Sequence, residues 1–140
     1  MMTSLTDLYG EPIHQFTRAD ALKAGVLMAV PQSLSQEAGW RWPVALTAAA
    51  WSDCVAWGGE AEKRHPGHGQ SETGRLWDVL HMAFRAVRSA NPGARGGVPF
   101  AVLRISADGP SRATRAELAV CCGPGDKGEP VITIMQPQEE

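Results

Sequence analysis

The most conspicuous candidate for chemistry is the segment 123–128, which reads GPGDKG and matches the spacing G-x-G-x-x-G of phosphate-binding loops. Such loops bind phosphate because their glycines open directly onto a helix, whose first amides point at the anion. Here the glycines are followed by Pro130 and by the run 131–135, VITIM, which favours a strand. The sequence therefore predicts a turn between two strands rather than a phosphate-binding loop.

The residues of this turn have a structural and a functional interpretation. The three glycines permit positive φ angles, and Asp126 is suited to close an Asx turn on its own backbone. The turn is nevertheless longer than a tight hairpin requires, and it gathers Asp126, Lys127 and Glu129 at one end of a rigid sheet, where loops often bind. We therefore keep these three residues as candidate ligand or partner contacts.

An unusual aromatic cluster, Trp40-Arg41-Trp42, is the main candidate for a partner-binding surface. Trp and Arg are the residue types most enriched among the anchors of protein interfaces. The alternative is that these tryptophans belong to the core, because Trp is usually largely buried. We expect Trp40, Arg41 and Trp42 to anchor a partner.

Arginine provides a second functional hypothesis. Residues 71–120 contain seven of the 13 basic side chains, all of them Arg, against four acidic ones. A guanidinium holds a carboxylate or phosphate through two parallel hydrogen bonds. The alternative function is therefore binding or sequestration of an anionic nucleotide through Arg104, Arg112 or Arg115. The simpler interpretation is a solvated charged surface.

The histidines and cysteines do not have the spacing of a metal site. His65 and His68 lie in the glycine-rich segment 58–70, where two imidazoles alone do not form a site. Cys121 and Cys122 are adjacent in a predicted strand, so their side chains point to opposite faces. We expect no metal and no cofactor, and the role of the segment 58–70 stays open.

The segment around His14 resembles the first strand and helix of ADP-ribosyltransferase-like proteins, in which a His on that strand contacts the nicotinamide dinucleotide. The resemblance rests on His14, Thr17 and Gly25, and it covers under a quarter of the chain. No glutamate stands in a matching catalytic setting downstream. The resemblance implies an ADP-ribosyltransferase-like enzyme as a further alternative, and the question of enzymatic activity stays open.

The pattern of apolar residues predicts an α+β fold. A C-terminal three-strand meander (100–105, 114–121 and 131–135) and a strand at 26–30, buried on both faces, should form an antiparallel β-sheet. Two main helices, at about 47–57 and 71–90, should pack against it, because their apolar residues recur at helical spacing. Thr17 and Asp20 fit the capping box of a short helix that ends at Gly25, and 33–38 fits another short helix. Pro43 disfavours a helical conformation at Trp42, so the segment 40–46 should begin in an extended conformation.

Bulk composition places limits on localisation and partners. The chain has 140 residues, which suits a single domain over 1–140. Its net charge of -2 argues against a general nucleic-acid coat or a membrane-surface binder, both of which need excess Lys and Arg. Three cysteines make a poor disulfide framework, and no signal peptide or membrane span is evident, so we expect a cytoplasmic protein.

Five segments, taken in order, resemble a functionally uncharacterised family of small bacterial proteins that are often carried on plasmids, integrative elements and phages. The segments are LYGEPI (8–13), TRADALKAGVL (17–27), AGWRWPVALTAAAW (38–51), GRLWDVL (74–80) and CGPGDKGEPVITIM (122–135). The resemblance implies a single small domain in a mobile genetic element and no particular activity. By analogy with other proteins of such elements, the resemblance implies a role in host defence or plasmid maintenance.

The resulting expectation is a non-enzymatic accessory protein that binds a host macromolecule, most simply a host protein. Trp40, Arg41 and Trp42 would be its anchors, and the turn with Asp126, Lys127 and Glu129 a second contact. An unpaired edge strand would also allow a homodimer.

Overall fold

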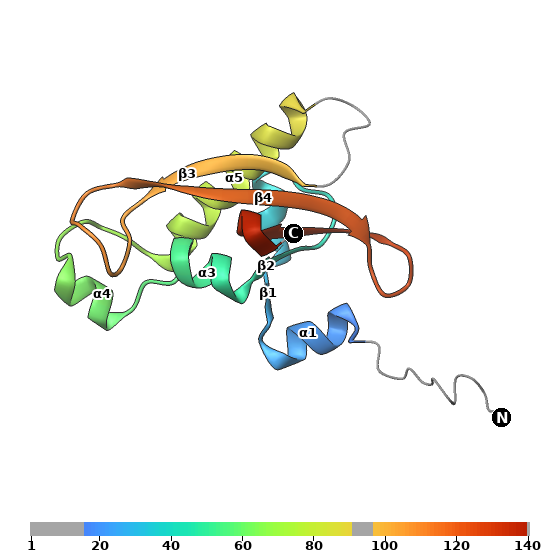
Figure 1. The fold of residues 1–140 in the computed structure, drawn as a ribbon, viewed down its shortest axis with the longest axis horizontal. Helices are drawn as coiled ribbons and strands as arrows, with labels where there is room; N and C mark the ends of the chain where they lie inside the picture. Colours follow the sequence, from blue (N-terminus) through green and yellow to red (C-terminus); the bar gives the residue numbers. More distant parts are fainter. Residues whose placement is uncertain (1–15, 91–96, 140) are drawn as a thin grey trace.

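A five-stranded sheet runs through the computed structural model, which describes residues 16–90 and 97–139 (Figure 1). The strand order is β1-β2-β5-β4-β3, so β1 and β3 form the two edges of this sheet. The fold is therefore α+β, as the sequence predicts. The strands are β1 (Leu27–Ala29), β2 (Val44–Thr47), β3 (Val98–Arg104), β4 (Thr114–Pro124) and β5 (Pro130–Met135).

The sheet is mixed, which corrects the expectation of an antiparallel one. The meander of β3, β4 and β5 is antiparallel as expected, but β2 pairs in parallel with β5, with Val44 opposite Ile132 and Leu46 opposite Ile134. Parallel pairing is possible because the long stretch between β2 and β5 contains helices that cross over the sheet. The segment 40–46 is extended as predicted, and its end forms a central strand.

The first strand differs from its prediction. The apolar run 26–30 contains β1, but β1 pairs only with β2, so it is an edge strand. Leu27 and Met28 are half-buried and Ala29 is exposed. The prediction that this strand is buried on both faces is therefore wrong, because an apolar composition does not distinguish a central strand from a short edge strand covered on one side.

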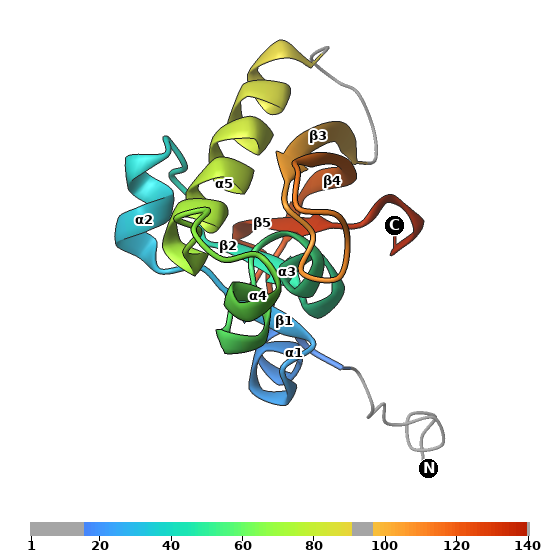
Figure 2. The ribbon, with the colours of Figure 1, turned by 90° about the vertical axis from the view of Figure 1, so that its left-hand side faces the viewer.

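One face of the sheet carries the hydrophobic core. Alternate residues of each strand point to this face, including Leu46, Leu118 and Ile134, whose side chains are fully buried. The helices α2 (Gln32–Glu37), α3 (Ala48–Cys54) and α5 (Glu72–Ser89) supply the opposing side chains, such as Leu80. Figure 2 shows α5 alongside β3 and β4, with α2 packed on its far side.

Local sequence signals set the helix boundaries. Thr47 caps α3 by accepting a hydrogen bond from the amide of Ala50, and Ser71 caps α5 by accepting one from Gly74. The two helices predicted at 47–57 and 71–90 are thus present. Within the part of the chain that the structure describes, no helix combines the length and the hydropathy that crossing a bilayer requires.

The segment 58–70 contains a helix that the sequence analysis did not predict, α4 (Gly59–Arg64). Glu60 and Glu62 lie in its first turn, and Lys63 and Arg64 in its last, which complements the helix dipole. Its apolar side is a single buried residue, Ala61. One turn of apolar contact is too little to give a detectable periodic pattern.

The turn at 123–128 joins β4 to β5, and Pro130–Met135 is a strand, as predicted. Of its glycines only Gly128 has a positive φ, at 81°, which corrects the expectation for the other two. The carboxylate of Asp126 accepts hydrogen bonds from the amides of Arg18 (2.8 Å) and Ala19 (3.0 Å). It therefore caps α1 (Arg18–Ala24) instead of closing its own Asx turn.

We predict that Asp126→Ala destabilises the protein by about 1–2 kcal/mol, because two amides at the start of α1 lose their acceptor. Urea unfolding followed by circular dichroism measures this difference. The matched control is Lys127→Ala, one residue along the same turn, which should change the free energy of unfolding by less than about 0.5 kcal/mol. Equal effects of the two substitutions would contradict the capping role.

Candidate binding site

Trp40 belongs to the core. Its side chain is 6 % exposed, its indole Nε1 donates a hydrogen bond to the carbonyl oxygen of Leu80 (3.1 Å), and its ring meets Phe84 edge-on with centroids 5.4 Å apart. The indole of Trp40 is therefore not accessible to a partner protein in this fold. The core interpretation of the aromatic cluster thus applies to Trp40, and Arg41 and Trp42 are the members left for contact with a partner.

Arg41 is exposed and Trp42 is 43 % exposed, and both lie just before β2. Because β2 and β5 are parallel neighbours, this segment lies at the same end of the sheet as the turn before β5, where Pro43 accepts a hydrogen bond from the amide of Ile132 (2.9 Å). The two predicted contact segments are therefore at one end of the molecule.

The acidic residues of the turn are engaged internally. Asp126 caps α1, and the carboxylate of Glu129 accepts a hydrogen bond from the amide of Lys127 (2.9 Å). Of the three candidate contacts, only the side chain of Lys127 is exposed with no role in the turn. His14, on which the resemblance to ADP-ribosyltransferases rests, lies outside the described residues.

The arginines expected to hold a phosphate do not converge on one point. Arg104 pairs with Asp53 through Nη2 and Oδ1 (2.9 Å) and donates a further hydrogen bond to the hydroxyl of Thr114 (2.8 Å). Arg115 pairs with Glu117 on the strand surface, and Arg112 is exposed. Two of the three guanidinium groups are thus already paired with carboxylates.

His65 is buried, with 1 % of its surface exposed, and its Nδ1 lies 2.6 Å from the hydroxyl oxygen of Ser111. Its ring stacks on Trp57, with centroids 6.0 Å apart, and His68 meets it edge-on. Among residues 16–90 and 97–139, no three His, Cys, Asp or Glu side chains gather as metal ligands would. His65 thus fastens the segment 58–70 to the loop that precedes β4.

The sequence analysis missed Arg75, which is the most deeply buried charged side chain in the described part of the chain, at 5 % exposure. Its guanidinium donates to the carbonyl oxygens of Val55 (3.1 Å) and Ile105 (2.9 Å) and to the side-chain oxygen of Gln70 (2.8 Å). It also lies over the ring of Trp57, 4.8 Å from the centroid. These contacts join α5 to the ends of α3 and β3.

Arg75 has no carboxylate partner within ion-pair distance among the described residues. Its Nη2 is buried without a hydrogen-bond acceptor. Burial lowers the pKa of Arg75, but a guanidinium stays protonated at neutral pH. The site therefore contains a buried positive charge whose hydrogen-bond acceptors are neutral, while the carboxylates of Asp53 and Asp78 act on it from beyond ion-pair distance.

Cys54 lies beside this cluster as a neutral thiol. Burial and the nearby carboxylate of Asp53 raise its pKa to about 12. It therefore supplies no negative charge to Arg75 at physiological pH.

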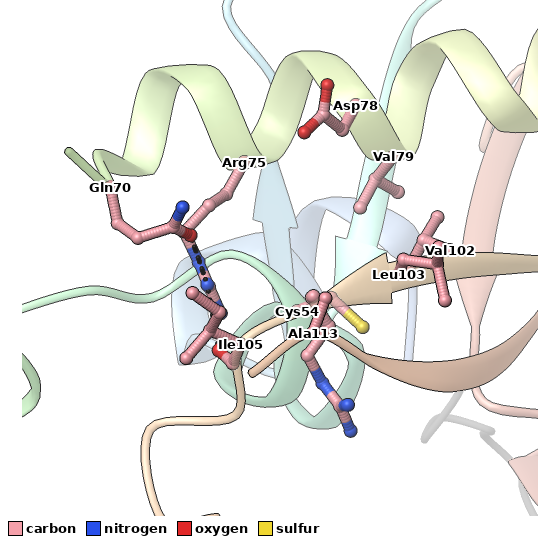
Figure 3. A pocket seen from close by; sticks show the side chains of 10 residues that line it. Cys54, Gln70, Arg75, Asp78, Val79, Val102, Leu103, Ile105 and Ala113 are labelled. Atoms are coloured by element: carbon pink, nitrogen blue, oxygen red, sulfur yellow. Dashed lines mark hydrogen bonds between the residues drawn. The ribbon is translucent and has the colours of Figure 1, made fainter. Parts of the chain in front are cut away.

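A small cavity of about 130 Å³ opens between α3, α5 and the end of β3 (Figure 3). Arg75 runs from α5 toward Ile105 along one wall, and Asp78 lies one turn further along the same helix. Gln70 and Ala113 also line this cavity. We call it the arginine cavity.

A larger, mostly apolar groove of about 430 Å³ continues from the arginine cavity along the outer edge of β3. Asp78, Val102 and Leu103 line both, so the two spaces are neighbours. We call this the edge groove. Its remaining lining residues are His81, Met82, Ala101 and Arg115.

Leu103 projects from the edge strand with 70 % of its surface exposed, and Met82 on α5 is 37 % exposed. The sequence alone does not reveal this exposed surface. It shows that Leu103 lies in an apolar strand, but only the strand order shows that this strand, β3, is an edge of the sheet.

The chain belongs to a family of unknown function, DUF6573, whose model matches residues 8–140. No curated protein and no solved structure shows significant similarity to it. The resemblance to an uncharacterised family is thus confirmed, and the geometry of the site carries the functional argument.

We predict that Cys54 resists alkylation in the folded protein while Cys122 reacts. Four pH units below a pKa of about 12, only about one thiol in ten thousand is ionised, and the Cys54 side chain is also buried. Cys122 is exposed and serves as the internal control. Peptide mass mapping after iodoacetamide treatment at pH 8 measures both. Labelling of Cys54 at the rate of Cys122 would show that the arginine cavity opens readily.

Proposed function

We propose that this protein is a binding protein that accepts an extended segment of a partner protein as an additional strand along β3. The single observation that carries the proposal is the coincidence of an open strand edge with the edge groove. An added strand forms main-chain hydrogen bonds to such an edge, and pockets on either side select its side chains.

The backbone of β3 is suited to this pairing. One edge of β3 is paired with β4, and no other described strand lies beyond it. The carbonyl of Ile105 turns away from β4 to reach Arg75. Because the directions of backbone groups alternate along a strand, the amides and carbonyls of Leu103 and Ala101 face the same outer side.

The side chains around the groove would hold both faces of an added strand. Met82 and His81 on α5 lie toward the helical side. Leu103, with Arg115 opposite it on β4, lies toward the other face of the sheet. Alternate residues of a bound segment would therefore meet an apolar surface on each side.

The contrast between the two edges of the sheet supports the choice of β3. The other edge strand, β1, has three residues and packs beside α1. β3 has seven residues, and its sequence VPFAVLR is apolar up to its last position. Proteins usually protect such an edge with charges, prolines, bulges or a covering segment. Pro99 protects the start of β3, but no described strand pairs with the outer edge after it, which favours a binding role.

The wider role that we propose is that of an accessory protein of a mobile genetic element, acting by capture of a host protein. The resemblance to plasmid-, integrative-element- and phage-borne proteins supports this setting. The exposed pair Arg41 and Trp42, with Lys127 at the same end of the sheet, offers a second contact surface for the same partner.

We predict that Leu103→Asp weakens partner binding at least tenfold, because it puts a charge into the apolar contact of the added strand. The measurement is fluorescence polarisation with peptides selected on the unaltered protein from a random library. Leu103 is mostly exposed, so the free energy of unfolding should change by less than about 0.5 kcal/mol.

The matched control is Leu22→Asp on α1, where a leucine is 37 % exposed far from β3, and it should leave binding unchanged. Loss of binding in Trp42→Ala with full binding in Leu103→Asp would instead favour the surface around Arg41. A rise in melting temperature with nucleotides alone would favour the nucleotide alternative.

A further inference from the structure

We propose that the segment bound along β3 ends in the arginine cavity, so that its free C-terminal carboxylate pairs with Arg75. This inference rests on the proposed function and names the chemistry of the ligand. It combines the charge state of Arg75, the end of the usable strand edge and the size of the cavity.

The first argument is the uncompensated charge of Arg75. A buried ion normally has a partner of opposite charge, because removal from water costs several kcal/mol per ion. Arg75 is 5 % exposed, and no described carboxylate pairs with it. Arg104, on another wall of the cavity, is already neutralised by Asp53. Asp78 also lines the cavity and acts on Arg75 at longer range, but among the described residues no carboxylate contacts the guanidinium, and an incoming carboxylate would supply that contact.

The second argument is the unused donor of Arg75. Its Nε and Nη1 are engaged with Val55, Gln70 and Ile105, whereas Nη2 is buried without an acceptor. An unsatisfied buried donor is costly and uncommon in a folded protein. A carboxylate oxygen bound in the cavity would be an acceptor for it once the side chain moves to expose Nη2, which is buried in the unbound protein.

The third argument is that the edge of β3 ends at Arg75. Ile105 is the next residue whose carbonyl points outward, and that carbonyl already accepts a hydrogen bond from Arg75. A segment that adds to β3 therefore cannot continue pairing past Leu103 and Arg104. It meets a guanidinium where the next strand hydrogen bond would be.

The fourth argument is the small size of the space at the end of the groove. The edge groove is about 430 Å³, but the arginine cavity at its end is only about 130 Å³ and is bounded by Gln70, Ile105 and Ala113. That space suits a terminal carboxylate better than a continuing chain. The bound segment would then run parallel to β3, with its C-terminus at the Ile105 end.

The position of Asp78 adds selectivity. It lies where the groove and the cavity meet, one turn after Arg75 on α5, and its side chain is exposed (Figure 3). An acidic side chain of the bound segment beside Asp78 would be repelled, whereas a carboxylate deeper in the cavity faces Arg75. A free C-terminus therefore fits better than an internal Asp or Glu.

The test uses the unaltered full-length protein and two libraries of random hexapeptides, one with free C-terminal carboxylates and one with C-terminal amides. We expect binders from the free-acid library whose affinity falls at least tenfold when the same peptides are amidated, the loss of one charge-assisted hydrogen bond. Equal affinity of acids and amides, or binders from neither library, overturns the inference.

Two variants separate the inference from the proposed function. Arg75→Gln should abolish the preference for free acids, and Arg41→Gln, at the other end of the sheet, should keep it. Should Arg75→Gln fail to fold, the comparison of free-acid and amidated peptides on the unaltered protein still tests whether the carboxylate is recognised.

If amides bind as well as acids and Leu103→Asp abolishes the binding of both, the proposal for the edge groove is correct and the proposal for the carboxylate site is wrong. If Leu103→Asp leaves binding intact, the proposed function itself is wrong.

Discussion

The buried guanidinium of Arg75 is the interaction that organises the end of the molecule where the candidate site lies. It reaches carbonyl oxygens at the end of α3 and just after β3, and its own backbone belongs to α5. Three elements that are distant in sequence are thereby fixed to one planar group with a rigid donor geometry. The arginine cavity at the end of the edge groove exists because these elements are held at that spacing.

A second constraint acts at the opposite end of the sheet. The parallel pairing of β2 with β5 brings the segment before β2 beside the turn at 123–128, and Asp126 of that turn caps α1. The most conspicuous motif of the sequence is therefore used to fasten the start of the described chain to its C-terminal hairpin. The capping role explains Asp126, and the positive φ of the turn explains Gly128, without a phosphate.

Local signals were sufficient wherever the determining contacts are local. The capping box of Thr17 and Asp20, the caps at Thr47 and Ser71 and the strand after Pro130 involve neighbours within a few residues, and each is present. The parallel β2 could not be predicted, because its four residues lead directly into α3 and its partner strand lies far along the chain.

The Asp126 cap and the contacts of the candidate site could not be predicted for the same reason, because their partners lie far apart in the sequence. The partners of Asp126 are 107 and 108 residues away, and the acceptors of Arg75 come from three separate segments. Trp40 and Trp42 show that residue type alone does not predict burial. They are two residues apart, yet Trp40 lies in the core and Trp42 is exposed. Burial depends on the tertiary arrangement, which these patterns do not encode.

The central claim is that a partner adds to the outer edge of β3. The most direct measurement is amide hydrogen exchange of the protein with and without a bound segment, resolved to single residues by NMR. The account predicts that the amides of Ala101 and Leu103 become strongly protected on binding, since they enter new strand hydrogen bonds. Unchanged exchange at both amides, with new protection around Arg41 and Trp42 instead, would contradict it.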